Sequence, residues 1–576
     1  MNNIDTDSEF SLLYPFGSER PTGVERWGEN TVEDLGIEQL AWALSIDNKY
    51  HDRIKFLLLE LCGDTQIIEY RQKILEDLLI NIEITAGLEE LLPLLEKLHD
   101  YALARSRGSP LHQTLGRLTE LNTYVICVNK LHSLLEKMGP VLHSPGLAAL
   151  CKKVKQIESD EIFQSLAKSL PELLSKLNDI PSITIGINLD SELRPIQATL
   201  LSINDKPFKG GTLMDRLMGR KSGRKPNQGI GPLHSVPQQQ LMAGGRIINL
   251  PTRMEPTMVP LFNDLHELLK LVILPIAGTL QQYAQVNARS LIALEEELAF
   301  YLGAIRVIRQ MRARGLSVCR PKVLTMQERA CHMKGVYNLL LALRKAEDDR
   351  DSNLAKVLVP NNVEFGPKGR IFILTGPNQG GKTVYTQALG VAQVLFQAGL
   401  HVPAGAARMS PVDGIYTHFA TLEKTNSGMG RLGEEAKRLN EIFHSVTDKS
   451  LVLLNESLSS TSPGESLYLA QDIVRALRLF CVRAIFATHL HELAEGVDLI
   501  NAEVTGDSRV VSLVAGVALT GDKVDVIDNV VPRTYKIKPG PPRGLSYAKG
   551  IAAQHGISFE QLTERWREQQ EQDSRK

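Results

Sequence analysis

The sequence lacks the features that mark several special classes of protein. Its six cysteines lie far apart and form no CxxC pair, so we expect reduced thiols rather than a disulfide framework or a zinc site. No hydrophobic run approaches the roughly 18 residues of a membrane-spanning helix, and the acidic first twenty residues argue against a secretory signal. Lysine and arginine (65) balance aspartate and glutamate (66), so any polyanionic partner must be contacted by a local patch. We therefore expect a cytoplasmic protein with no membrane partner.

Length and hydrophobic period divide the chain into regions. At roughly 150 residues per domain, the 576 residues correspond to about four domains. Apolar residues recur at helical spacing over 41–180 and over 262–316, and the second stretch would be about 75 Å long if continuous, with a kink at Pro275. The expected regions are a poorly ordered tail (1–40), a helical core (41–180), a β-containing insertion (181–261), a long helix (262–316), an α/β domain (317–530) and a C-terminal helical segment (531–576).

The α/β domain is indicated by alternating strand and helix patterns. Apolar strands are expected at Arg370–Gly376, Ser450–Leu454 and Val482–Ala487, and a helix at Thr383–Ala398. Because a Gly-rich turn joins the first strand to this helix, we expect a parallel sheet at the centre of the domain.

The Gly-rich turn, GPNQGGKT, matches the phosphate-binding pattern GxxxxGK[ST] without a mismatch. Glycines allow backbone N–H groups to approach a phosphate, and the N-terminus of the following helix adds its positive dipole. Lys382 would contact the β- and γ-phosphates of ATP, and the Thr383 hydroxyl would ligate Mg²⁺. The alternative, a chance Gly-rich turn, is disfavoured by the strand and helix that flank it. The expected ATP-binding residues are Gly376, Pro377, Asn378, Gln379, Gly380, Gly381, Lys382 and Thr383.

Two candidate catalytic residues follow later strands. Glu456 ends an apolar strand and is the candidate general base, while Asn455 before it would join Thr383 at the metal. An amide oxygen carries no charge, so Asn455 predicts weaker Mg²⁺ binding or slower hydrolysis than an aspartate would give. His489 ends the next strand, where an imidazole can sense a γ-phosphate; a purely structural hydrogen bond is the alternative.

Four segments together resemble the MutS family of DNA mismatch-repair ATPases, whose usual forms are TGPNMGGKST, LVLxDE, a Gly/Thr/Ser-rich signature ending in Asp-Gly, and ATH. The four are TGPNQGGKT (Thr375–Thr383), LVLLNES (Leu451–Ser457), STSPGESLYLA (Ser460–Ala470) and FATHLHEL (Phe486–Leu493). Weaker similarity covers Asp64–Leu79, which resembles the start of the family's helical core, and Gly544–Ile557, which resembles its C-terminal helix-turn-helix.

The resemblance implies a homodimer of ABC-type ATPase domains with two composite ATP sites. In each site the P-loop, Glu456 and His489 of one subunit would face the signature loop of the other, and residues 425–433 would contact nucleotide across the interface. The helical regions would be core and lever, the insertion a clamp that closes on DNA, and the last segment a dimerisation element. The expected signature-loop residues are Ser459, Ser460, Thr461, Ser462, Gly464 and Glu465.

The chain also departs from the family pattern. The departures are Asn455 for Asp, Leu458-Ser459-Ser460 for Gly-Arg-Gly, Glu465 for Asp, Gly430 for a phosphate-contacting Ser, and Leu358 for an aromatic residue that often stacks on adenine. Together they indicate a divergent subfamily with less efficient hydrolysis. No Phe-x-Glu motif occurs, and only residues 1–40 precede the helical core, so we expect no N-terminal mismatch-recognition domain and no direct recognition of that wedge-inserting type.

The insertion contains the densest basic segment of the chain, between expected strands at Ile183–Leu189 and Arg246–Leu250. Such a cluster can contact phosphates and make affinity salt-dependent, although a solvated loop is the alternative. Phe208 is the one aromatic residue among these charges, so duplex or branched DNA held by its backbone is favoured over stacked single strands. The expected DNA-binding residues are Lys206, Lys209, Arg216, Arg220, Lys221, Arg224 and Lys225.

The sequence therefore predicts a multidomain protein: an all-α core and lever with a small β-containing clamp-like insertion, then an α/β P-loop (ABC-type) ATPase domain and a C-terminal helical segment. We expect an ATP- and Mg²⁺-dependent, homodimeric DNA clamp acting in DNA repair or recombination control, with downstream repair proteins as candidate further partners. The alternative is a nucleotide-gated scaffold with little ATP turnover. An ABC-type motor for another cargo, such as a transporter subunit, is disfavoured by the long helical arms and the lack of a membrane partner sequence.

Overall fold

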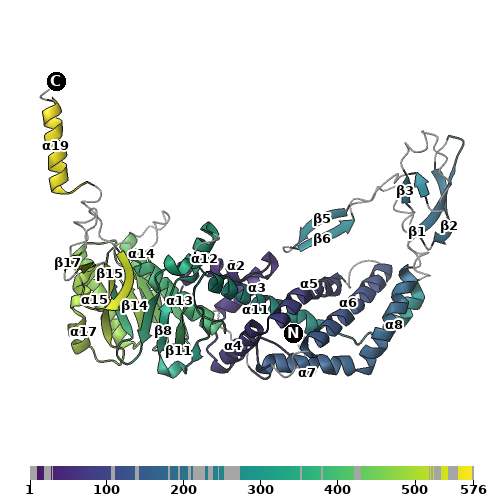
Figure 1. Ribbon diagram of the computed structural model, residues 1–576, viewed down its shortest axis with the longest axis horizontal. Helices are drawn as coiled ribbons and strands as arrows, with labels where there is room; N and C mark the ends of the chain where they lie inside the picture. Colours follow the sequence, from purple (N-terminus) through teal and green to yellow (C-terminus); the bar gives the residue numbers. More distant parts are fainter. Residues whose placement is uncertain are drawn as a thin grey trace. The chain divides into compact units, whose positions relative to one another are not determined.

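The computed structural model describes most of the chain and separates it into two compact units. The described residues are 10–18, 27–28, 30–104, 110–136, 142–178, 182–192, 195–204, 206, 209–211, 228–230, 238–243, 246–251, 273–349, 353–377, 380–420, 430–517, 519–520, 523–524, 533–542 and 556–573. One unit consists of Met1–Ile80 with Ala299–Lys576, and the other of Asn81–Leu298. Their elements are labelled in Figure 1, and each unit is described by itself. The six-region division expected from the sequence stays a prediction.

The first unit is built on a six-stranded sheet with the order β12-β13-β14-β10-β15-β18. Its strands are β12 (Ile415–Phe419), β13 (Leu451–Asn455), β14 (Arg483–Ala487), β10 (Ile371–Thr375), β15 (Val510–Val517) and β18 (Arg533–Pro539). The first five run parallel, and β18 pairs antiparallel with β15 at one edge. Every residue of β10, β12, β13 and β14 is buried. The largely apolar sequences of β10, β13 and β14 follow from this burial, because parallel sheets are covered on both faces.

Helices connect the parallel strands and complete the core of the first unit. They are α13 (Lys382–Gln397), α14 (Arg431–Ser445), α15 (Pro463–Leu479), α16 (His491–Glu495) and α17 (Val497–Glu503). Leu454 of β13, Phe486 of β14 and Val474 of α15 belong to one hydrophobic cluster and are at most 1% exposed. The predicted strands and helix of the α/β domain are thereby confirmed to within about two residues at each end.

A smaller mixed sheet and further helices extend the first unit. The sheet has the order β7-β11-β8-β9, formed by Lys322–Val323, Ala406–Met409, Cys331–Val336 and Asn361–Phe365. The helices are α2 (Ile37–Leu44), α3 (His51–Leu59), α4 (Thr65–Ile80) and α12 (Leu339–Asp348), with the C-terminal part of α11 (Arg289–Ala313). Gly303 of α11 allows close packing, because a Cβ there would lie 1.7 Å from the carbonyl oxygen of Leu44.

The N-terminal residues that the structure describes are packed within the first unit, whereas a poorly ordered tail was expected over 1–40. Leu12 and Leu13 are fully buried, and the Tyr301 hydroxyl donates to the carbonyl oxygen of Leu12 at 2.7 Å. Residues Thr31–Asp34 form the short helix α1, and the Asp34 carboxylate accepts a hydrogen bond from Thr417 of β12 at 2.6 Å. The high Gly, Pro and acidic content of residues 1–40 suggested poor order, and the few buried apolar residues among them were not recognised from the sequence.

The second unit is a helical bundle with a β-containing insertion. Its helices are α5 (Ile82–Ala104), α6 (Pro110–Glu136), α7 (Pro145–Ser159), α8 (Glu161–Asn178), residues 273–281 and the first part of α11. Buried leucines on α5 and α6, such as Leu91, Leu95 and Leu131, pack at its centre. A part-buried polar contact joins two of these helices, where His99 Nδ1 lies 2.7 Å from the Glu295 carboxylate.

The expected long helix over 262–316 is interrupted in its described part. Helical residues end at 281, residues 282–288 form turns and coil, and α11 begins at Arg289. Pro275 lies within the helical stretch 273–281, and the kink expected there stays a prediction. The interruption is stabilised by Arg117 of α6, whose guanidinium donates to the carbonyls of Tyr283 and Val286 at 3.0 and 2.8 Å. A partner distant in sequence thus replaces the lost helical hydrogen bonds.

In its described residues the insertion contains short paired strands, and two of them confirm predictions. β1 (Ser182–Leu189) pairs antiparallel with β2 (Pro195–Asn204), and β5 (Gln238–Ala243) pairs antiparallel with β6 (Arg246–Pro251). β3 (Lys209–Gly211) and β4 (Gln228–Ile230) form a third, parallel pair. Of the expected DNA-binding residues, Lys206 is exposed and Lys209 begins β3. The remaining five, Arg216, Arg220, Lys221, Arg224 and Lys225, lie outside the described residues.

The C-terminal segment, 531–576, begins with a strand that the sequence analysis did not foresee. Residues Arg533–Pro539 are the edge strand β18 of the main sheet, and α19 (Phe559–Asp573) follows. Ile557, Phe559, Leu562 and Trp566 expose large apolar side chains at this end of the chain. Among the helices that the structure describes, none combines the length and apolar character needed to cross a membrane.

Candidate active site

The P-loop is built by two glycines in conformations that other residues rarely adopt. Gly376 follows β10 with φ +145°, and a Cβ there would lie 2.7 Å from the side chain of Ala515. Gly381 has φ +89° and precedes α13, whose first residue is Lys382. The turn therefore directs the backbone around the N-terminus of α13, as phosphate binding requires. Asn378 and Gln379 lie outside the described residues.

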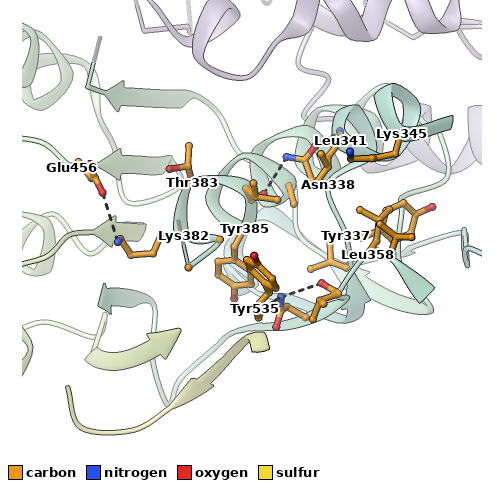
Figure 2. Close-up of a pocket in the computed structure, with 18 residues that line it drawn as sticks. Tyr337, Asn338, Leu341, Lys345, Leu358, Lys382, Thr383, Tyr385, Glu456 and Tyr535 are labelled. Atoms are coloured by element: carbon orange, nitrogen blue, oxygen red, sulfur yellow. Dashed lines mark hydrogen bonds and ion pairs between the residues drawn. The ribbon is translucent and has the colours of Figure 1, made fainter. Parts of the chain in front are cut away.

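Lys382 is the buried cation of this site, with 4% of its surface exposed. Its Nζ donates to the carbonyl oxygens of Gly376 and Pro377 at 3.1 and 3.2 Å, and lies 3.6 Å from Glu456 Oε1 (Figure 2). Burial lowers the pKa of Lys382, and the neighbouring Glu456 carboxylate opposes that effect. The ammonium is thus held by weak carbonyl acceptors and one carboxylate, a set that a phosphate can replace.

Thr383 and Asn455 connect the P-loop helix to the end of β13. The Thr383 hydroxyl donates to the side-chain oxygen of Asn455 at 3.2 Å. These two oxygens and the Glu456 carboxylate are the hard ligands that Mg²⁺ prefers, although neither Thr383 nor Asn455 carries a charge. The donor set therefore fits a nucleotide-bound Mg²⁺ rather than a cation held by the protein alone. In the described residues no three His, Cys, Asp or Glu side chains converge as a metal cluster.

A cavity of about 480 Å³ opens beside these residues. Figure 2 shows Glu456, Lys382 and Thr383 at one end of it, which we call the phosphate end. Tyr337, Leu341 and Leu358 lie at the other end, which we call the apolar end, together with the half-exposed Lys345. The combination of a charged end and an apolar end matches a ligand that carries phosphates and a planar base.

Tyr535 of β18 also lines this cavity and was not foreseen from the sequence. Its ring lies close to the P-loop, with Cδ1 3.5 Å from where a Cβ of Gly381 would be, and 43% of its surface is exposed. The Asn361 side chain donates to its carbonyl oxygen at 3.0 Å, which fixes the strand. No local sequence motif indicates that Tyr535 belongs to the site, because the edge strand that brings it to the P-loop is distant in sequence.

The other expected site residues lie apart from the cavity in this chain. His489 is exposed and is absent from the cavity lining. The signature-loop residues surround the N-terminus of α15, where Ser462 is the N-cap and its hydroxyl donates to Glu465 at 2.9 Å. Hydrogen bonds from Thr461 and Ser462 lower the pKa of Glu465. Ser459 and Gly464 are exposed, and Ser460 is partly buried. Their expected roles toward nucleotide and partner stay predictions.

Two protein-family models match separate parts of this chain. The model of the MutS2 N-terminal domain matches residues 63–314, and the model of MutS domain V matches residues 372–529, so the two together cover most of the sequence. The chain is 30% identical over 195 residues to the DNA mismatch repair protein MutS of Caldanaerobacter subterraneus subsp. tengcongensis, which is 33% of this chain and 22% of that protein.

Two other relatives give the same picture. The chain is 38% identical over 157 residues to DNA mismatch repair protein MutS 1 of Halobacterium salinarum, covering 26% of this chain and 18% of the relative. It is 30% identical over 208 residues to DNA mismatch repair protein MutS of Chlamydia pneumoniae, covering 35% and 24%. The chain therefore matches less than a quarter of the length of each of these curated relatives.

Proposed function

Because this chain belongs to the MutS family, we propose that it is a DNA-binding ATPase related to mismatch repair, in which ATP and Mg²⁺ bind at the P-loop cavity. ATP binding would pair two chains through their P-loops and signature loops and change how tightly the insertion holds duplex or branched DNA. The observation that carries this proposal is the buried Lys382 ammonium at the phosphate end of a cavity whose other end is apolar.

Each residue of the candidate site has its own proposed role in binding ATP and Mg²⁺. Lys382 would exchange its carbonyl contacts for phosphate oxygens, and Thr383 with Asn455 would orient the metal. Mg²⁺, when bound, supplies the positive charge that neutralises the phosphates. Glu456 would orient the attacking water and accept its proton. We retain His489 as a candidate γ-phosphate sensor.

The base is proposed to stack on Tyr535. The ring faces the same cavity as Leu358, which stands where the family often has an aromatic residue. Tyr535 would thus supply from β18 the aromatic contact that position 358 lacks, with Leu341 and Leu358 closing the apolar end.

Nucleotide binding by the intact chain tests this assignment. A fluorescent ATP analogue is titrated against wild type and Lys382→Met, with Lys437→Met as the matched control, because the Lys437 side chain is exposed on α14 and does not line the cavity. Loss of binding in Lys382→Met alone supports the site. Equal binding by Lys382→Met and wild type would refute it.

DNA binding is tested through its salt dependence. Each phosphate contact contributes about 0.9 to the slope of log K against log salt concentration on duplex DNA. Replacing Lys206, Lys209 and Arg216 by Gln should lower that slope, whereas replacing the control residues Lys356, Lys437 and Lys449 should not. Homoduplex, mismatched and four-way-junction DNA are compared with ADP and with ATP. An unchanged slope would remove the basic segment from the proposal.

A second candidate function is a nucleotide-gated scaffold with little turnover. It is favoured by the uncharged Asn455 beside Thr383 and by the exposed position of His489 outside the cavity. Steady-state ATP hydrolysis with and without DNA separates the two candidates. ATP binding with no DNA-stimulated turnover supports the scaffold, and stimulated turnover supports the ATPase.

A further inference from the structure

The backbone turns sharply after Glu456. The turn uses left-handed backbone angles, which are energetically unfavourable for residues other than glycine. Glu456 has φ +54° and Leu458 has φ +65°, both in the left-handed region. Leu458 stands where the resemblance to the MutS family has a glycine, which would adopt this conformation freely. In this chain the turn must therefore be held by other contacts.

Those contacts come from β12, α15 and the hydrophobic core. His418 of β12 places its ring Nδ1 2.7 Å from the hydroxyl of Ser457, which lies between the two left-handed residues. The Ser466 hydroxyl of α15 donates to the carbonyl oxygen of Leu458 at 2.7 Å, and the Leu458 side chain is buried in the core cluster. Only Glu456 of this turn reaches the cavity.

The hydrogen bonds at Ser457 assign the proton of the His418 ring. The Ser457 hydroxyl also lies 3.2 Å from the carbonyl oxygen of His418, which can only accept. Since the hydroxyl has one hydrogen, it donates to that carbonyl, and Nδ1–H must donate to the hydroxyl oxygen. Burial lowers the pKa of His418 to about 4, so the ring is neutral near pH 7 with its proton on Nδ1.

We propose that His418 and Ser457 are positioning residues for Glu456. Their buried hydrogen bonds stabilise the left-handed turn and so aim the Glu456 carboxylate at Lys382 Nζ, 3.6 Å away. Neither side chain lines the cavity, and both are buried, so they act through Glu456 alone. The inference rests on the proposed nucleotide site and adds the device that orients its candidate base.

A double-mutant cycle on nucleotide affinity tests this role without requiring turnover. Glu456→Gln removes a carboxylate that competes with phosphates for Lys382, and we expect it to raise affinity for a fluorescent ATP analogue about tenfold, or 1.4 kcal/mol. In a Ser457→Ala background the carboxylate is no longer held, so the same change should alter affinity less than twofold. Ser450→Ala, a buried serine at the opposite end of β13, is the control and should leave the tenfold effect intact.

Variants of His418 provide the second test. His418→Asn can offer an amide N–H close to the position of Nδ1–H, whereas His418→Leu cannot. We expect Asn to preserve the Glu456→Gln effect and Leu to abolish it, and kcat, where measurable, to fall in His418→Leu and not in His418→Asn. These variants also serve if Ser457→Ala does not fold.

The outcomes separate the two proposals. Equal Glu456→Gln effects in the wild-type, Ser457→Ala and His418→Leu backgrounds would overturn the positioning role while leaving the nucleotide site standing. A wild-type chain that binds no ATP analogue would overturn the proposed function, and this inference with it.

Discussion

Thr383 donates a hydrogen bond to Asn455 across 3.2 Å, which joins the first turn of the P-loop helix to the end of the neighbouring strand β13. In a site for a nucleotide-bound cation this pair supplies two neutral oxygens. A carboxylate in place of the amide would contribute a full negative charge at nearly the same position, so the identity of one atom sets the electrostatics of the metal position.

Asn455→Asp is therefore expected to strengthen Mg²⁺-dependent nucleotide binding. A gain of about 1–2 kcal/mol is reasonable for a charged ligand next to a divalent cation, and corresponds to about tenfold in affinity. Turnover should rise as well. Titration of Mg²⁺ at fixed nucleotide measures the first effect and steady-state hydrolysis the second. Asn440→Asp, which adds the same charge on the exposed side of α14, is the control. No rise in metal affinity or in rate would contradict the role given to Asn455.

Tyr535→Ala should weaken nucleotide binding about tenfold. Stacking of a base on an aromatic ring contributes about 1–3 kcal/mol, and the ring of Tyr535 lies next to the P-loop in the cavity. Tyr535→Phe keeps the ring and should stay within about threefold of wild type. Tyr468→Ala, on the exposed surface of α15, is the matched control. The measurement is direct titration with ATP and with inorganic triphosphate. A loss that is equal for both ligands would exclude stacking as its cause.

The parts of the site that lie within one continuous motif were predictable from the sequence. The strand β10, the glycine turn and α13 are consecutive, so their pattern alone indicated how they fold, and the structure confirms these elements. Asn455 and Glu456 were also placed correctly at the end of a buried strand. The apolar runs of these strands are informative because the strands are buried on both faces of the sheet.

The parts that depend on contacts between distant segments were not predictable. Tyr535 reaches the cavity only because β18 adds antiparallel to the sheet edge. His418 meets Ser457 only because β12 and β13 are neighbours. The interruption of the long helix depends on Arg117, which donates to the carbonyls of Tyr283 and Val286. Neither Pro nor Gly marks that break in the sequence.

Gly303→Ala should strongly destabilise the first unit. The new Cβ would lie 1.7 Å from the carbonyl oxygen of Leu44. Relieving this clash would require the backbones of α11 and α2 to move apart. Overpacking of this kind typically costs about 1–3 kcal/mol, and a backbone clash belongs at the upper end. Gly278→Ala is the matched control, because it is also helical and has open space around its Cα. Gly278→Ala should stabilise the folded chain slightly, because alanine has a higher helix propensity than glycine. Thermal unfolding of both variants is compared with wild type; equal midpoints for the two would contradict the close packing.

The last prediction concerns acid stability and His401. Its ring is buried in a small apolar cavity beside Leu400 and Met311, and within the described residues neither ring nitrogen has a hydrogen-bond partner. Burial lowers the pKa of His401 from 6.5 to about 4, and Arg312 and Arg320 contribute to the shift. Between these two values the unfolded chain binds a proton that the folded chain does not. The contribution of His401 to stability is thus complete above about pH 6.5 and is lost as the pH falls toward 4.

His401→Leu should make the free energy of unfolding less sensitive to acid. One pKa unit corresponds to about 1.4 kcal/mol, so the wild-type chain loses about 2 kcal/mol through His401 between pH 7 and pH 5. The loss of unfolding free energy between pH 7 and pH 5 should be smaller by that amount in His401→Leu. In His444→Gln, which changes an exposed residue, the loss should equal that of the wild type. Urea unfolding at pH 7, 6 and 5 measures the difference. Burial also lowers the pKa of His418, so the free energy of unfolding of His401→Leu should still depend partly on acid. Identical pH profiles for His401→Leu and wild type would show that His401 takes up a proton in the folded chain as readily as in the unfolded one.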